Sequence, residues 1–146
     1  MTKAGAEMAG LVIDSSVALA WFLPGEGSSQ TLALLEQTTE EGALVPGLWR
    51  IEIANVLLVA ERRRRITEAQ RMRALAALGS LPIRTDPNMA DHAWTTILEI
   101  AAAHELTVYD AAYLELSLRA ALPLATLDDA LQRAARTIGV VLLGHR

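Results

Sequence analysis

Gly10-Leu-Val-Ile-Asp-Ser-Ser16 is the stretch that decides the fold of this chain. The apolar run at residues 11–13 predicts a short buried strand, and one of the two serines behind it can cap a helix over residues 17–23. Asp14 stands directly after the strand. An ionised carboxylate in an apolar setting is costly to desolvate unless a positive charge compensates it, so Asp14 is the first candidate for a functional residue.

Strand and helix patterns alternate along the rest of the chain. This alternation predicts an α/β fold, an α/β/α sandwich with a mostly parallel central sheet. Two of the predicted helices, at 48–65 and 67–78, form a helical hairpin that we expect to protrude. Further strands are predicted at 43–45, 81–85, 124–126 and 140–143, and further helices at 28–41, at 88 or 91 to 104, at 108–122 and at 128–138.

Length and composition restrict the class of protein. The chain has 146 residues, of which 52% are hydrophobic, and it contains no cysteine, which excludes disulfides, zinc–thiolate sites and thiol nucleophiles. No apolar run reaches the length of about 18 residues that a membrane span needs. We therefore expect a soluble, cytoplasmic protein without a membrane partner, with a flexible tail at residues 1–9 and a single domain at 10–146.

Three more acidic residues share the setting of Asp14. They are Glu52, Asp110 and Asp128, each at the end of a strand-like run or on a helix face that we expect to point inward. In a parallel sheet the functional site lies outside the carboxyl ends of the strands, where Asp14 and Asp128 belong. Four such carboxylates suggest one shared cation, and ligands that offer only oxygen favour Mg²⁺ or Mn²⁺ over zinc or copper.

Each of these acids also has a plainer interpretation. Asp14 and Asp128 could serve only as helix N-caps, and Asp110 could be an ordinary first-turn acid. Glu52 could lie on a solvated helix face. Of the adjacent pair we interpret Asp128 as the ligand, and Asp129 as a cap or a peripheral acid.

Four motifs in series resemble those of PIN domains, in particular the VapC toxins of bacterial toxin–antitoxin pairs. They are strand-Asp-x-Ser, Pro-x-Leu-x-x-x-Glu-x-x-Asn-x-Leu, Tyr-Asp-Ala-Ala-Tyr and Leu-Ala-Thr-Leu-Asp, and the resemblance covers about residues 10–143. The matching positions are Asp14, Ser16, Pro46, Leu48, Glu52, Asn55, Leu57, Tyr109, Asp110, Tyr113, Thr126 and Asp128.

The resemblance implies a metal-dependent endoribonuclease that hydrolyses phosphodiester bonds in RNA. It implies Asp14 and Asp110 as direct ligands of Mg²⁺, for which Mn²⁺ would substitute, and Glu52 and Asp128 as residues that act directly or through water. The hydroxyls of Ser16 and Thr126 are expected to bond these carboxylates and to fix their rotamers. Asn55, three residues after Glu52 on the same helix face, is expected to support it.

The charge distribution allows a nucleic acid substrate without requiring one. The net charge of −4 argues mildly against phosphate binding. Basic residues nevertheless gather near Glu52, and they either bind the substrate or form a solvated helix end. These residues are Arg50, Arg62, Arg63, Arg64 and Arg65.

Other classes remain open beside a ribonuclease toxin. A haloacid-dehalogenase-like phosphatase would need a second aspartate where Ser16 stands, and a PIN-like binding module would be expected to have lost an acid. A PIN-domain nuclease of RNA processing that is not a toxin is a further alternative. The toxin interpretation implies a small cognate antitoxin. A surplus of apolar residues on the predicted hairpin predicts a homodimer: Leu57, Leu58, Val59, Leu75 and Leu78.

Overall fold

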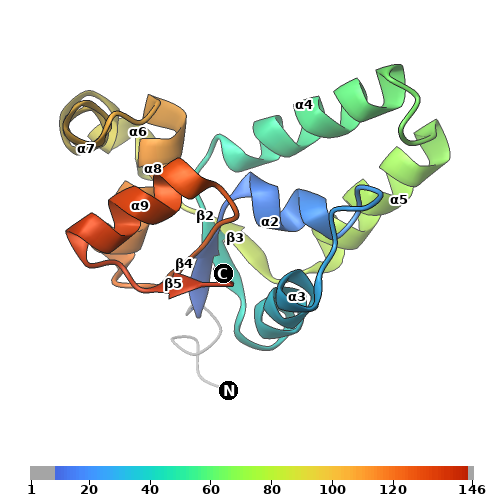
Figure 1. Ribbon diagram of the computed structural model, residues 1–146, viewed down its shortest axis with the longest axis horizontal. Coiled ribbons are helices and arrows are strands. Elements are labelled where there is room, and N and C mark those ends of the chain that lie inside the picture. Colours follow the sequence, from blue (N-terminus) through green and yellow to red (C-terminus); the bar gives the residue numbers. More distant parts are fainter. Residues whose placement is uncertain (1–8, 145–146) are drawn as a thin grey trace.

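Five short strands form one central sheet in this computed structural model, which describes residues 9–144 (Figure 1). The strand order is β3-β2-β1-β4-β5 and every neighbouring pair is parallel, which confirms the predicted α/β/α fold. Of the expected tail at residues 1–9, only Ala9 lies inside the described range. The strands are β1 (Leu11–Ile13), β2 (Ala43–Val45), β3 (Ile83–Thr85), β4 (Leu124–Ala125) and β5 (Leu142–Leu143).

Helices cover both faces of this sheet. In Figure 1 the sheet lies between α8 and α9 on one side and α2 and α3 on the other, while α4 and α5 extend away as the predicted hairpin. None of the helices in residues 9–144 is both long and apolar enough to cross a membrane. The helices are α2 (Ser15–Ala20), α3 (Ser29–Glu41), α4 (Trp49–Arg62), α5 (Glu68–Ser80), α6 (Met89–His92), η1 (Ala93–Ile97), α7 (Leu98–His104), α8 (Val108–Ala120) and α9 (Asp129–Ile138).

The segment from residue 88 to residue 104 differs from the single helix that we predicted. It consists of α6, a π-helical turn (η1) and α7. A π turn widens the helix locally, which apolar periodicity in the sequence does not reveal. On this turn the Trp94 side chain is 90% exposed.

Two of the five apolar residues that we assigned to an interface on the hairpin belong to the core instead. Leu57 and Leu78 are buried, and Leu58 and Val59 are half-buried. Leu75 alone among the five is classed as exposed. The prediction was wrong at Leu57 and Leu78, because α4 packs against both α2 and α5 and so buries more than one face.

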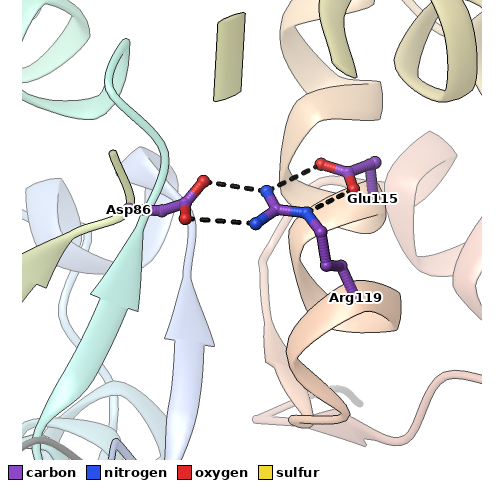
Figure 2. Close-up of polar contacts among 3 residues, drawn as sticks. All are labelled: Asp86, Glu115 and Arg119. Atoms are coloured by element: carbon purple, nitrogen blue, oxygen red, sulfur yellow. Dashed lines mark hydrogen bonds and ion pairs between the residues drawn. The ribbon is translucent and has the colours of Figure 1, made fainter. Parts of the chain in front are cut away.

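An ion-pair cluster that the sequence analysis missed fastens α8 to the loop after β3 (Figure 2). The guanidinium of Arg119 donates two hydrogen bonds to the Asp86 carboxylate, at 2.8 and 3.1 Å, and two to the Glu115 carboxylate, at 2.7 and 3.0 Å. Asp86 and Glu115 are buried. The hydrogen bonds from Arg119 hold the pKa of Asp86 below its usual range. Like Asp14, Asp86 comes directly after a strand. The residue that neutralises it, Arg119, lies 33 residues further along the chain, which is why the sequence analysis missed the pair.

Candidate active site

Two neighbouring strands bring Asp14 and Thr126 together. Asp14 follows β1 and Thr126 follows β4, and because these strands pair in parallel their carboxyl ends meet at one edge of the sheet. The Thr126 hydroxyl donates a hydrogen bond to Asp14 Oδ2, and the Ser16 hydroxyl donates one to Asp14 Oδ1 at 2.5 Å. Both hydroxyls therefore fix the rotamer of the Asp14 carboxylate.

The same hydroxyls join the two strand ends to each other. The backbone N–H of Leu127 donates to Ser16 Oγ, and that of Asp128 donates to Thr126 Oγ1, both at 3.0 Å. Asp14 is also the N-cap of α2, since Val17 N–H donates to its Oδ1 at 3.3 Å. Asp14 can thus serve as a helix cap and as a functional residue at the same time. With two bonds to Oδ1 and one to Oδ2, a lone pair of Oδ2 is left for another partner.

Burial dominates the electrostatics of Asp14. The side chain is buried, and desolvation raises its pKa to about 6. The hydrogen bonds from Ser16, Thr126 and Val17 N–H oppose this shift, because they stabilise the charged form. The negative charge of Asp110 adds a smaller upward contribution to the pKa, which requires Asp110 to lie within electrostatic reach of Asp14.

Glu52 reaches the same region from the first turn of α4. The phenol of Tyr113, on α8, donates a hydrogen bond to Glu52 Oε1. Burial raises the pKa of Glu52, and the charge of Asp110 raises it further, whereas hydrogen bonds from Tyr113 and Ser15 lower it. Tyr113 entered the sequence analysis only as a motif position, and nothing in the sequence indicated its contact with Glu52.

Asp110 and Asp128 complete the group. Asp110 lies half-buried in the first turn of α8, and its pKa is raised by burial and then by the charge of Asp128. Asp128 accepts a 2.8 Å hydrogen bond from Leu131 N–H and is therefore the N-cap of α9. Because Asp128 occupies the cap position and Asp129 is exposed, Asp129 has the second of the two roles that we allowed for it, that of a peripheral acid and not that of the cap.

Asp110 is the electrostatic centre of the four acids. Its charge acts on Asp14 and on Glu52, and the charge of Asp128 acts on it. Within residues 9–144, no three acidic or histidine side chains are placed to enclose a metal ion together. The donor set nevertheless fits Mg²⁺, which is commonly held by one or two carboxylates and completed by water and substrate oxygens. Asp14, with its free lone pair, and Asp110 are the pair that we expect to hold it.

The remaining predicted site residues lie on α4 and in the turn that follows it. Asn55 is exposed and lines a hollow of about 260 Å³ together with Arg63 and Arg65. Arg65 pairs with Glu26 at 3.1 Å, and Arg62, Arg63 and Arg64 are exposed. Arg50 donates to the Ile83 carbonyl oxygen at 3.2 Å and to Thr85 Oγ1 at 3.3 Å, so it is occupied in holding α4 to β3.

A hollow lined by residues of α2 and α4 reaches Asp128, one of the four acids. It has a volume of about 470 Å³, and its lining includes Leu19, Leu23 and Val56 as well as Ser16 and Asp128. Glu26 and Arg65, which form the ion pair just described, also line it. Asp128 is thus accessible from a surface that combines apolar side chains with both signs of charge.

Comparisons with known proteins agree with this fold. The crystal structure of PAE2754 from Pyrobaculum aerophilum superposes with a TM-score of 0.68 at 23% identity, covering 94% of this chain and 92% of that one. The crystal structure of FitAcB from Neisseria gonorrhoeae gives a TM-score of 0.63 at 15% identity, covering 91% and 96%. No curated protein matches the sequence. The family model described as PIN domain matches residues 11–137, so the chain belongs to the PIN domain family.

Proposed function

We propose that this protein is a Mg²⁺-dependent endoribonuclease, and that it acts as the toxin of a toxin–antitoxin pair. PIN domains are typically metal-dependent nucleases, which supports the reaction class. The observation that carries the proposal for this chain is the electrostatic coupling of Asp110 to Asp14, Glu52 and Asp128 beside a sheet edge where Ser16 and Thr126 fix the Asp14 carboxylate.

The residues have distinct tasks in such a reaction. Asp14 and Asp110 would hold the cation, and Ser16 and Thr126 keep Asp14 in one rotamer. Glu52 and Asp128, both coupled electrostatically to Asp110, would bind the cation directly or through a water molecule that they orient. When bound, Mg²⁺ supplies a water of lowered pKa and charge neutralisation at the phosphate.

A small antitoxin is the protein partner that fits this site. The motif resemblance to VapC toxins supports such a partner, and the hollow between α2 and α4 offers it apolar contacts at Leu19, Leu23 and Val56. An arginine from the partner would supply the counter-charge that the acids need, because guanidinium groups bind carboxylates through two parallel hydrogen bonds.

A homodimer is the second assembly that we propose, with an interface different from the one expected on the hairpin. Exposed apolar side chains gather around η1 and the start of α8, where Trp94 is 90% exposed and Tyr109 61%. Both line an apolar hollow of about 400 Å³, together with Leu98 and Val108. In a twofold dimer the exposed ring of each copy would enter the apolar hollow of the other.

Cleavage of a labelled RNA that contains a single-stranded loop tests the reaction. We expect cleavage with Mg²⁺ or Mn²⁺ and none with EDTA. Asp110→Asn should lower the rate by more than about 100-fold, because it removes a direct ligand of the metal. Loss of a residue that only hydrogen-bonds to a ligand lowers activity less, by about 10- to 100-fold. Asp129→Asn, at an exposed position, is the matched control and should keep most of the activity. Undiminished cleavage in EDTA, or by Asp110→Asn, would refute the proposal.

A further inference from the structure

The Tyr113 hydroxyl is a buried polar group that points at one of the proposed ligands. The Tyr113 side chain is 1% exposed, and its hydroxyl donates to Glu52 Oε1, 61 residues away in sequence. Tyr113 follows Asp110 by three residues on α8, which puts both on the same helix face. One turn of α8 therefore presents a carboxylate and a phenol to the same acidic centre.

We infer that Tyr113 is a positioning residue for Glu52, whose phenol takes up one carboxylate oxygen and thereby fixes the carboxylate toward Asp110. This inference rests on the proposed function. The side chain of a glutamate has three torsions, so without this hydrogen bond Glu52 is free to turn away from the site. Holding it in one conformation costs conformational entropy. The phenol has a single proton to donate and gives it to Oε1, so a cation or water shared with Asp110 meets Glu52 through its remaining lone pairs.

A purely structural role for Tyr113 predicts a different outcome from a positioning role. The aromatic ring belongs to the buried hydrophobic core, and Phe would keep that packing. If the ring alone matters, Tyr113→Phe leaves metal binding unchanged. If the hydroxyl positions Glu52, the variant folds, yet its metal site is less well ordered.

Binding of Mn²⁺ to the metal-free protein, measured by titration calorimetry, separates the two roles without relying on activity. We expect Tyr113→Phe to weaken Mn²⁺ binding by about 10- to 100-fold, the range for removing a partner that orients a ligand. Tyr109→Phe is the matched control, because this phenol is on the same helix but 61% exposed, and it should change the affinity by less than about twofold.

A double-mutant cycle tests whether the effect passes through Glu52. Glu52→Gln should weaken Mn²⁺ binding, and adding Tyr113→Phe to it should weaken it no further. Additive losses would overturn the inference, as would an unchanged affinity in Tyr113→Phe, or a Tyr113→Phe protein that does not fold even with Mn²⁺. Failure of the wild type to bind Mn²⁺ would instead refute the proposed function, and the inference with it.

Discussion

Asp14 is a carboxylate that the fold holds in an apolar place while surrounding it with donors. Desolvation raises its pKa and the hydrogen bonds of Ser16, Thr126 and Val17 N–H lower it, and desolvation prevails. The repulsion from Asp110 is the smallest of these contributions. A cation bound beside Asp14 would therefore offset mainly a burial penalty, and only secondarily the repulsion between acids.

The pH dependence of stability follows from this residue. The pKa of Asp14 rises from 3.8 to about 6 on folding, so the folded protein binds this proton more tightly than the unfolded chain. The contribution of Asp14 to the free energy of unfolding is thus fully present below pH 4 and declines as the pH rises through 6, by about 3 kcal/mol. Urea unfolding of the metal-free protein at pH 4.5 and 7.5 measures this decline.

Asp14→Asn isolates the contribution of Asp14 from that of other titrating groups. Since asparagine does not titrate, the variant should lose most of the decline between pH 4.5 and 7.5, whatever its absolute stability. Asp129→Asn, at an exposed position, should keep the wild-type pH dependence. A decline that persists in Asp14→Asn would show that another group causes it.

The sequence allowed the position of Asp14 to be predicted, but not all of its surroundings. A strand followed by aspartate, and a second strand followed by Thr-x-Asp, place Asp14, Thr126 and Asp128 at one sheet edge by topology alone. Asp86 also follows a strand, yet it is neutralised by Arg119. Contacts between elements, such as those from Arg119 to Asp86 and from Tyr113 to Glu52, depend on how helices pack and leave no local signal.

At the scale of elements, α8 has two tasks along its length. Its first turns carry Asp110 and Tyr113 at the acidic centre, and its last turns carry Glu115 and Arg119, which fasten it to the loop after β3. The Asp86 N–H donates to the Val45 carbonyl oxygen at 2.8 Å, so this loop is itself fixed to the end of β2. The cluster therefore contributes to the placement of α8 against the sheet.

Removal of Arg119 should destabilise the fold through the two acids that it leaves behind. In Arg119→Met the Asp86 and Glu115 carboxylates stay buried without a counter-ion, and we expect a loss of about 3 kcal/mol, the lower end for a buried pair. The lower end applies because the Arg119 side chain is 26% exposed. Urea unfolding at pH 7 measures the loss, and Arg133→Met, an exposed arginine on α9, is the control.

Acid should reduce this difference between Arg119→Met and the wild type. Arg119 lowers the pKa of Asp86 in the folded wild type, so the stability that Asp86 contributes is present near neutral pH and declines as the pH falls through that lowered pKa. In Arg119→Met the buried Asp86 carboxylate can take up a proton instead. An equal loss at pH 4 and pH 7 would show that lost packing of the arginine stem, and not charge, causes the destabilisation.

Regular elements were predictable to the extent that their stabilising interactions are local. The helix over 67–78 was predicted from Thr67, and the structure has its N-cap there, with Gln70 completing a capping box. The break in the helix over 88–104 was not predictable, because a π turn has no local sequence signal. Which face of α4 is buried also depended on its packing against α2 and α5, and this reversed our expectation for Leu57.

At the scale of the whole molecule, the apolar surface around η1 includes residues that are close in sequence to those of the acidic centre. Tyr109, which lines the hollow at this surface, directly precedes Asp110. The hollow also receives Leu48, from the turn that leads into the helix of Glu52. A twofold interface on this surface would therefore involve residues adjacent in sequence to those of the acidic centre in both protomers.

Light scattering after size exclusion tests this assembly. We expect the wild type at micromolar concentration to have about twice the mass of the 15.7 kDa chain, because exposed apolar patches of this kind usually mark interfaces. Trp94→Glu should be monomeric and folded, since it places a charge where the proposed interface excludes water and Trp94 makes little contact with the rest of its own chain. Met72→Glu, 57% exposed on α5, is the matched control and should stay dimeric.

A monomeric wild type would refute the dimer, whereas a dimeric Trp94→Glu together with a monomeric Met72→Glu would move the interface back to the hairpin. Mn²⁺ affinity should be the same in the monomer and the dimer, because each protomer supplies all four acids of its own centre.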